Sequence, residues 1–259
     1  MKTASLLSNT RFYILATSFL ISILVAAWLR LEIQSDQLYY IRLQQVFGLL
    51  CVLYWCVALM ISPVGYVVGK HRMKRIEFAR RAIGVSAAYF AALHGSIALW
   101  GPLGGINELL LLPTLFKWSL LAGGFAFVIL LIMAATSFDK VVKLMTFKRW
   151  KLLHRLVYIA WVLVVLHIWT VGTHLAYSNI QWAAFIALTL LAGLELYKVT
   201  QKLNEKYFHL EKAENVTLFV SSWLIVAGIL ITAPMFIQDY HSKHADHNGI
   251  SKHTEVDDE

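Results

Sequence analysis

Four histidines lie in or beside long apolar segments of this chain, where an ionisable side chain is costly and is a candidate functional group by default. The segment RWKLLHRLVYIAWVLVVLHIWTVGTH, which begins at residue 149, contains His154, His167 and His174. The segment at 82–100 contains His94. A membrane histidine can also do no more than hydrogen-bond a neighbouring helix. Spacing therefore has to decide between these two roles.

Two of these histidines are predicted to stand at one depth in the membrane. His94 lies 12 residues after Ala82, where a span is expected to begin, and His167 lies 13 residues after His154. At about 1.5 Å per residue, both imidazoles stand roughly 18–20 Å from the same membrane edge. Two imidazoles at one depth can bind one metal from opposite sides. In apolar surroundings that metal is expected to be heme iron, because a bare zinc or copper ion needs further polar ligands.

His154 is predicted at the inner membrane edge, about 20 Å from His167. Thirteen residues turn a straight helix by about 220°, so the two side chains are expected on different faces and at two separate sites. A partner for His154 is not obvious, because Arg80 and Arg81 stand where a second histidine is needed, and His71 lies in the adjoining basic segment. An interfacial histidine that caps the helix is the alternative.

Three further residues are candidates for cofactor binding. Arg80 and Arg81 could pair with heme propionates or a flavin phosphate, because the planar guanidinium group binds such anions well. Ordinary positive charges at the end of a span are the alternative. His174 follows His167 by seven residues on the same predicted face, near the outer surface. It could contact a propionate or an outer partner, or it could be an interfacial polar residue.

The composition indicates a membrane protein. Of the 259 residues, 59% are hydrophobic and 15% are charged, whereas soluble domains carry about 25% charged residues. Apolar stretches of about 20 residues, the length that crosses a bilayer as a helix, recur along the chain. We predict an all-α integral membrane domain over residues 1–235 and a tail over 236–259. The seven predicted spans are 12–29, 45–68, 82–100, 114–136, 155–174, 178–197 and 216–234.

The distribution of charge predicts the topology. Basic residues gather in the segments 69–81 and 137–151, and the positive-inside rule places such segments in the cytoplasm. Segments 30–44 and 101–113 have almost no net charge and are predicted outside. The N-terminus is therefore expected inside and the C-terminus outside. The net charge of +8 is explained by topology and contact with membrane lipid, not by nucleic-acid binding.

The sequence carries neither a G-x-G-x-x-G fingerprint nor a P-loop, so nucleotide chemistry is expected on another chain. Cys51 and Cys56 lie five residues apart in one predicted span and cannot pair with each other. They are expected to be small packing residues.

Two stretches carry a family resemblance. ARRAIGVSAAYFAALHGSIALW (79–100) has R-R-x-x-G ahead of L-H, and RWKLLHRLVYIAWVLVVLHIWT (149–170) has W-K-x-L-H-R-x-V-Y with a second histidine thirteen residues later. Over about 45–200 the chain resembles the ferric-reductase-like transmembrane family, and within it the heme-binding membrane subunit of the periplasmic methionine sulfoxide reductase system. The resemblance implies a six-helix core that holds one or two b-type hemes through His94, His154 and His167. It also implies that electrons come from a cytosolic flavin donor carrying FMN or FAD.

Two features lie beyond that family core. A seventh span is predicted at 216–234, and the tail DYHSKHADHNGISKHTEVDDE follows it. The tail contains the loosely spaced histidines His241, His244, His247 and His253. Clustered imidazoles and carboxylates could weakly bind an iron, copper or zinc ion. A disordered polar terminus is the alternative.

We interpret the chain as an electron-transfer subunit of the bacterial inner membrane, linking a cytosolic flavin reductase to a periplasmic oxidoreductase. A transmembrane ferric or cupric reductase with a metal-ion acceptor is the first alternative, which the tail favours. A non-redox transporter or assembly subunit is the second. A transporter is expected to show helix-breaking Gly/Pro pairs at mid-membrane, whereas the four prolines lie mostly near span ends.

Overall fold

The computed structural model describes residues 2–68, 70–171, 178–209, 211, 214, 216–221, 223–225, 227, 228 and 232. All the regular elements in these residues are helices, as the sequence predicts. The chain forms two compact units, Met1–His174 and Leu175–Glu259.

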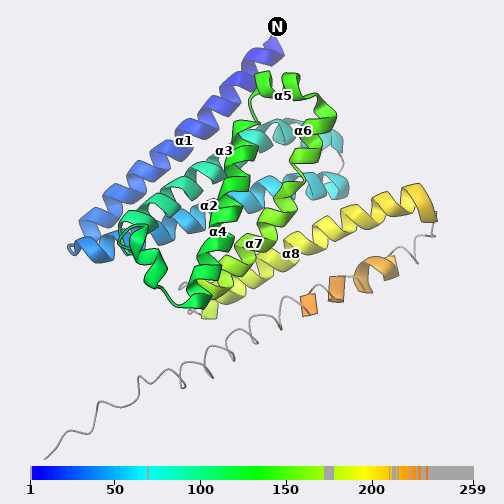
Figure 1. Ribbon diagram of the computed structural model, residues 1–259. Helices are drawn as coiled ribbons and strands as arrows, with labels where there is room; N and C mark the ends of the chain where they lie inside the picture. The colour runs from blue at the N-terminus through cyan, green and yellow to red at the C-terminus, as the bar shows by residue number, and fades with distance from the viewer. Residues whose placement is uncertain are drawn as a thin grey trace, which may run out of the picture. The chain divides into compact units, whose positions relative to one another are not determined.

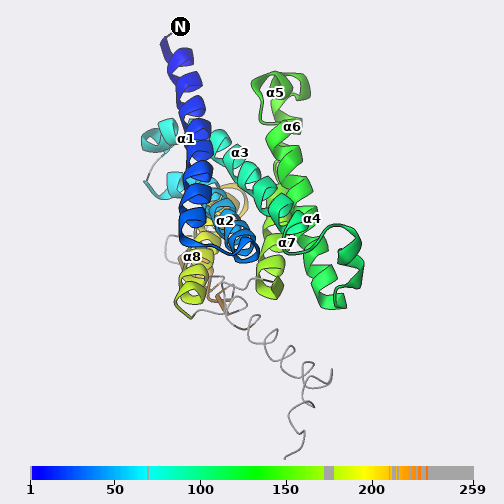
Figure 2. The ribbon, with the colours of Figure 1, turned by 90° about the vertical axis from the view of Figure 1, so that its left-hand side faces the viewer.

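The first unit contains the helices that carry the candidate site. In chain order they are α1 (Lys2–Glu32), α2 (Asp36–Val68), α3 (Lys70–Trp100), the 3₁₀ turn η1 (Asn107–Leu111), α4 (Thr114–Ala135), α5 (Asp139–Met145), α6 (Phe147–Leu153) and α7 (Leu156–Val171). The most extensive helix interfaces join α2 to α3 and α4 to α7, and α1 packs on α3. Figures 1 and 2 both show α4 and α7 side by side. The unit is therefore built around two helix pairs, α2–α3 and α4–α7.

Five helices of this unit are long and apolar enough to cross a bilayer: Thr10–Glu32, Asp36–Gly65, Ala79–Trp100, Thr114–Ala135 and Phe147–Ile168. They correspond to the first five predicted spans. The spans predicted at 178–197 and 216–234 are not among the five that the described residues provide. A shorter apolar helix, Val216–Ile225, covers part of the seventh. Seven spans, like the inward N-terminus, remain a prediction.

The helices extend beyond the predicted span ends. The segments 30–44 and 69–81 were expected to be loops, but α1 continues to Glu32, α2 begins at Asp36 and α3 begins at Lys70. Segment 30–44 contains neither proline nor glycine, and segment 69–81 contains no proline and only one glycine, Gly69. Lys, Arg, Glu and Gln are also good helix formers. The charged ends therefore continue the helices, so the hydrophobic limits of a span do not mark the helix ends.

Small and aromatic residues pack α1 and α2 against α3. Ser86 and Phe90 on α3 are both fully buried. The Ser18 hydroxyl on α1 donates to the Ser86 hydroxyl at 2.8 Å, a contact that lets two membrane helices approach closely. The Phe90 ring meets Phe47 and Tyr54 of α2, with centroids 6.0 and 5.2 Å apart. These contacts fix the position of α3 relative to its neighbours.

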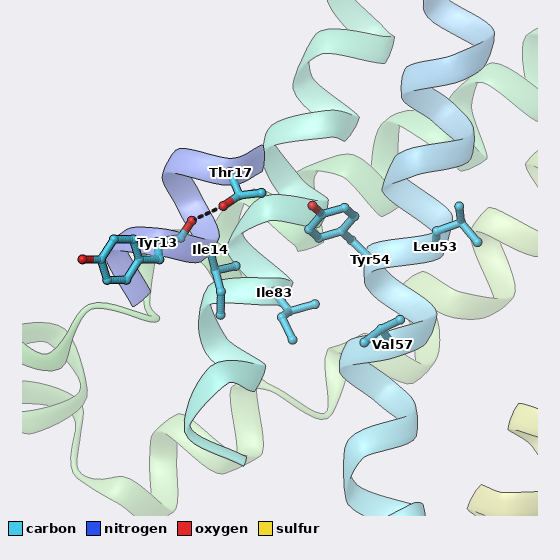
Figure 3. A pocket seen from close by; sticks show the side chains of 7 residues that line it. All are labelled: Tyr13, Ile14, Thr17, Leu53, Tyr54, Val57 and Ile83. Atoms are coloured by element: carbon cyan, nitrogen blue, oxygen red, sulfur yellow. Dashed lines mark hydrogen bonds between the residues drawn. The ribbon is translucent and has the colours of Figure 1, made fainter. Parts of the chain in front are cut away.

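A groove with a volume of about 430 Å³ lies between α1, α2 and α3 (Figure 3). Its lining residues are Tyr13, Ile14, Thr17, Leu53, Tyr54, Val57 and Ile83. The Thr17 hydroxyl donates to the Tyr13 carbonyl at 2.6 Å and is satisfied within its own helix. The groove is therefore mainly apolar. Large exposed side chains such as Phe19 on α1 and Phe125 on α4 likewise suit contact with lipid.

The second unit contains α8 (Ser178–Leu203) and the π-helical turn η3 (Asn204–Phe208). The Trp223 indole donates to the Thr189 carbonyl at 3.3 Å. The Tyr197 ring meets Phe219 edge-on, with centroids 5.3 Å apart. These contacts hold the short helix Val216–Ile225 against α8. Along α8, the buried Lys198 pairs with Glu195, one turn earlier.

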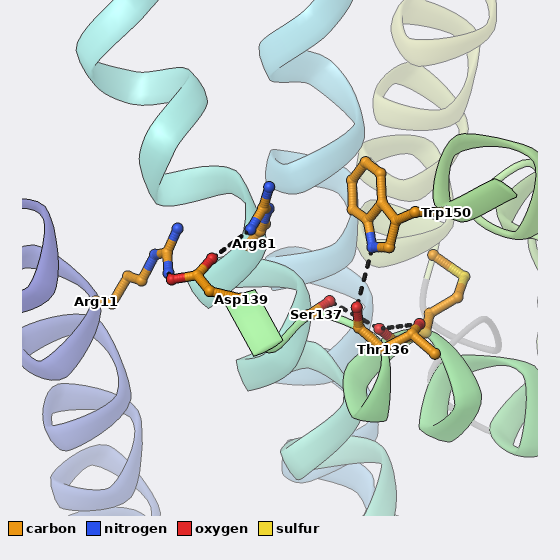
Figure 4. Close-up of polar contacts among 7 residues, drawn as sticks. Arg11, Arg81, Thr136, Ser137, Asp139 and Trp150 are labelled. Carbon is orange, nitrogen blue, oxygen red and sulfur yellow. Dashed lines mark hydrogen bonds and ion pairs between the residues drawn. The ribbon is translucent and has the colours of Figure 1, made fainter. Parts of the chain in front are cut away.

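One carboxylate links three segments of the first unit. Asp139, at the start of α5, accepts hydrogen bonds from Arg11 on α1 at 2.6 Å and from Arg81 on α3 at 2.8 Å (Figure 4). The hydrogen bond from Arg11 holds the pKa of the Asp139 carboxyl below its usual value, and the charge of Arg81 acts in the same direction. The beginning of the first span, the beginning of the third span and the α4–α5 connection thus meet at one end. This is the arrangement expected if all three are cytoplasmic.

Replacing this carboxylate should lower stability in a pH-dependent way. Asp139→Asn removes the charge from two ion pairs, but the side chain is 59% exposed, so the loss should be about 1 kcal/mol or less. Because the folded pKa is lowered, the contribution is present above the ordinary value of 3.8 and is lost as the pH falls through the folded value. Thermal unfolding in detergent should show a lower midpoint at pH 7 and convergence with the parent in acid. Asp36→Asn, which removes one local pair with Arg30, is the control, and a pH-independent difference for Asp139→Asn would contradict the assignment.

Candidate functional site: two facing imidazoles

The structure brings His94 and His167 together. His94 is on α3, His167 is on α7, and their ring centroids lie 6.3 Å apart with the planes at 75°. Each ring is part-buried between helices. The two histidines belong to different helix pairs: α3 packs mainly on α2, and α7 packs mainly on α4. The imidazoles therefore mark the place where the two helix pairs meet.

Each imidazole is held by a backbone carbonyl of the partner helix. His94 Nδ1 lies 2.8 Å from the Gln44 carbonyl oxygen on α2, and His167 Nδ1 lies 3.0 Å from the Ser119 carbonyl oxygen on α4. A carbonyl oxygen can only accept, so in each neutral ring Nδ1 must carry the proton and donate. Nε2 then keeps its lone pair. A histidine that donates from one nitrogen while the other is free to coordinate is the usual arrangement of a metal ligand.

Glycines provide the space for both rings. A Cβ added to Gly48 on α2 would lie 2.9 Å from His94 Nδ1, and one added to Gly123 on α4 would lie 2.8 Å from His167 Nδ1. Both distances are too short for an ordinary contact, and the crowded atom belongs to the imidazole in each case. Any side chain at these two positions would have to push the ring away from its carbonyl.

The hydroxyl groups of Ser119 and Thr170 both lie within hydrogen-bond distance of the His167 carbonyl oxygen. Ser119, which is 4% exposed, donates from its hydroxyl to the His167 carbonyl at 3.3 Å. The Thr170 hydroxyl hydrogen-bonds the Ser119 hydroxyl. Ser119 is thus bonded to His167 twice, once through its own carbonyl and once through its side chain. These bonds fix the register of α4 against α7 at the level of the ring.

The distance between the rings suits two ligands of one metal ion. A metal–imidazole bond is about 2 Å long and the ring centre lies about 1 Å behind the coordinating nitrogen, so ligands on opposite sides hold their centroids about 6 Å apart. The described residues contain no cluster of three or more His, Cys, Asp or Glu that could bind a metal ion. A bare ion would find two side-chain ligands here. The pair is suited instead to a metal that brings its remaining ligands with it.

His154 lies apart from this pair, at an interruption of the helix. A straight helix from His154 to His167 was expected, but α6 ends at Leu153 and α7 begins at Leu156. His154 Nδ1 lies 3.1 Å from the Trp150 carbonyl oxygen, four residues back, and the ring also interacts with the Met133 carbonyl. The His154 N–H still donates to the Trp150 carbonyl at 3.0 Å, whereas the N–H groups of Arg155, Val157 and Tyr158 donate to carbonyls three residues earlier. The chain therefore makes a tighter turn here, as in a 3₁₀ helix. One regular α-helix from His154 to His167 is not observed, and the expected difference in face between the two side chains stays a prediction.

Trp150 connects His154 to the ion pair of Asp139. The Trp150 and His154 rings have centroids 4.0 Å apart, and the Arg81 guanidinium lies 5.0 Å from the Trp150 ring centre. The indole nitrogen donates to the Thr136 carbonyl at 3.0 Å (Figure 4). Arg81, expected to bind a cofactor anion or to flank the span, thus contacts both Asp139 and Trp150. Arg80 lies close enough to His154 for their charges to interact.

The other predicted site residues lie outside what the structure describes. This applies to His174, to the tail with His241, His244, His247 and His253, and to the side chain of His71. Conversely, the sequence alone does not single out Gln44, Gly48, Ser119 or Gly123. A glycine inside an apolar helical segment is the one signal that could have indicated two of them.

Comparison with known proteins identifies related chains. The family model for the ferric reductase like transmembrane component matches residues 11–165, more than half of the chain, and ends just before His167. Three similar proteins are each named a protein-methionine-sulfoxide reductase heme-binding subunit. That of Herminiimonas arsenicoxydans is 34% identical, over 52% of this chain and 62% of the relative. That of Deinococcus radiodurans is also 34% identical, over 61% of this chain and 74% of the relative. That of Polaromonas naphthalenivorans is 30% identical, over 66% and 80%. No solved structure matches the chain.

Trp150 should stabilise the fold through its contacts at the junction between α6 and α7. Trp150→Phe keeps a ring against His154 and Arg81 but loses the hydrogen bond to Thr136, which should cost about 1 kcal/mol. Trp150→Leu also loses the ring contacts and should cost about 1–2 kcal/mol more. The free energy of unfolding in mixed micelles measures both changes. Trp118→Phe, at a tryptophan that is 66% exposed, should have little effect, and equal effects of the three substitutions would contradict the role of Trp150.

Proposed function

The chain belongs to the ferric-reductase-like transmembrane family, and on this basis we propose that it is a b-type cytochrome subunit of the bacterial inner membrane. It receives electrons from a cytosolic flavin donor and delivers them to a periplasmic methionine-sulfoxide-reductase-like oxidoreductase. The five apolar helices and the family support a multi-pass membrane protein. The names of the similar proteins support heme as the cofactor and a methionine sulfoxide reductase as the partner system.

The facing imidazoles are the observation that carries this proposal. His94 and His167 supply two imidazoles whose ring centroids lie 6.3 Å apart. The described residues contain no group of three or more His, Cys, Asp or Glu that could bind a metal ion. A porphyrin provides the four equatorial ligands that this site lacks, so the residues fit a heme better than a bare ion. Bound heme supplies a one-electron couple. His94 and His167 would hold it from both sides and leave no open coordination position, which suits electron transfer.

The two helices that carry the histidines are apolar, and their ligands are oriented by the backbone. Ala160 and Val165 on α7 and Phe90 on α3 are buried apolar side chains of these helices. The Gln44 and Ser119 carbonyls hold the ring orientations. Low dielectric and fixed ligands also reduce the reorganisation that accompanies a change of charge. The protein's task is therefore binding and orientation, and the cofactor carries the redox chemistry.

His154 is proposed to serve an inner heme or the inner end of the electron path. Its separation from His167 along the chain supports a separate site. Its contact with the Trp150 ring and its interaction with the charges of Arg80 and Arg81 support a position toward the proposed donor side. Arg80 and Arg81 are the nearby cations that could pair with propionates or a flavin phosphate. The alternative is a structural role, in which the contacts of the ring with the Trp150 and Met133 carbonyls hold the helix interruption.

The proposed electron donor binds the basic end of the molecule. Arg11, Arg81 and the residues of α5 and α6, with Lys140, Lys148, Arg149 and Lys151, lie in the segments assigned to the cytoplasm. Within residues 137–151, Asp139 is the only acidic residue. A positive surface attracts anionic headgroups and an acidic or phosphate-bearing partner. This supports docking of a separate flavin reductase at that end.

The two facing histidines should be needed for the same heme. His94→Ala and His167→Ala should each remove the same heme and its low-spin b-type bands from a reduced-minus-oxidised spectrum, because either loss breaks the two-sided site. His154→Ala should leave those bands and reduce the heme-to-protein ratio only if an inner heme exists. Full heme content in both His94→Ala and His167→Ala would overturn the proposal, whereas a ratio of one heme per chain unchanged by His154→Ala would remove the inner heme alone.

Delivery of electrons should require a partner protein rather than the C-terminal tail. A variant truncated after Asp239 loses the tail histidines. It should reduce ferric and cupric ions at the same rate as the full chain. The comparison is made at pH 7–8, where neutral imidazoles can bind metal. Reduction of methionine sulfoxide should appear only when the periplasmic oxidoreductase is added. If truncation instead lowers metal reduction at limiting metal with heme content unchanged, the metalloreductase alternative is correct.

A further inference from the structure

The two halves of the histidine site have the same construction. On α2, Gln44 provides the carbonyl that accepts from His94, and Gly48 lies four residues later beneath the ring. On α4, Ser119 provides the carbonyl that accepts from His167, and Gly123 again lies four residues later. The same spacing at both rings needs a physical explanation.

Helix geometry provides one. The carbonyl of residue i accepts the backbone N–H of residue i+4, and it has a second lone pair. The Cα–Cβ bond points toward the helix N-terminus, so the side chain of residue i+4 covers the turn that contains this carbonyl. Glycine at i+4 uncovers the carbonyl. The imidazole then occupies the space of the missing side chain, as the distances of 2.9 and 2.8 Å from a hypothetical Cβ show.

We propose that Gly48 and Gly123 are positioning residues that select the Nδ1–H form of His94 and His167 and so reserve Nε2 for iron. The inference rests on the proposed heme function and names residues that this function requires. Without access to the carbonyl, an imidazole in apolar surroundings would find its donor unsatisfied or turn its Nδ1 elsewhere. Each glycine acts through a histidine, and does not itself bind the metal.

Other glycines of the same helix pairs provide matched controls. A Cβ at Gly84 on α3 or at Gly124 on α4 would meet no heavy atom within 4 Å. Replacing any of these four glycines by alanine changes helix propensity in the same direction. Only Gly48→Ala and Gly123→Ala also close the space beneath an imidazole. Differences between the two sets therefore report the ring position rather than the helix.

The first experiment measures heme affinity of the purified full-length protein and its four alanine variants by titration with heme b. Gly48→Ala and Gly123→Ala should bind heme on the order of 10–100-fold more weakly, the range for lost outer partners of metal ligands. Gly84→Ala and Gly124→Ala should resemble the parent. Thermal unfolding without heme checks that each variant is folded. Equal affinities for all four variants would overturn the inference, while a parent that binds no heme would instead overturn the proposed function.

A second experiment tests the donated proton directly. His167→Gly removes the ring and leaves the Ser119 carbonyl and Gly123 in place. Added imidazole should restore the low-spin spectrum at a lower concentration than 1-methylimidazole, which coordinates through one nitrogen but has no N–H to donate. The same comparison in a His167→Gly/Gly123→Ala variant should show a smaller preference for imidazole. Equal rescue by both ligands in His167→Gly would contradict a role for the hydrogen bond.

Discussion

An imidazole placed among apolar helices needs a hydrogen-bond partner for its N–H, because an unsatisfied donor in such surroundings is costly. This requirement shapes the first unit of the chain. Both rings find a backbone carbonyl on a neighbouring helix, and both carbonyls are accessible because glycine follows four residues later. A side-chain acceptor would have been free to move, whereas a helix carbonyl is fixed. The position of each ring is therefore set by the packing of one helix pair.

The rest of the unit maintains that packing. The aromatic contacts around Phe90 fix α3 on α2, and the hydroxyl contacts of Ser119 fix α4 on α7. At the far end, Asp139 connects α1 and α3 to the beginning of α5. These contacts hold the helices at two levels, one at the imidazoles and one at the basic end. A helix held at two levels can shift little along its axis, which preserves the ring-to-ring distance.

The sequence predicts the helical class, five of the spans and the histidines that meet. Apolar length identifies spans because water is absent from the bilayer core, and equal depth suggests His94 and His167 because helical rise is regular. The carbonyl partners are not predictable in this way, since every residue has a carbonyl and only helix rotation determines which one faces a ring. The interruption at His154 is hidden for a related reason: WKLLHRLV contains neither glycine nor proline, and the tighter turn shows only in the backbone hydrogen bonds. The role of Asp139 depends on Arg11, which is 128 residues away.

The two helix pairs match in the order and spacing of the residues that hold the imidazoles. His94 follows its acceptor by 50 residues and His167 by 48, with the histidine on the later helix of each pair. If these histidines hold a heme as proposed, imidazoles presented in the same way on both sides would not distinguish this flat, non-covalently held ring from its flipped-over isomer. Thr170, three residues after His167, has Ile97 as its counterpart after His94. The choice between isomers consequently depends on such unequal positions, and on whichever side chains meet the rim of the ring.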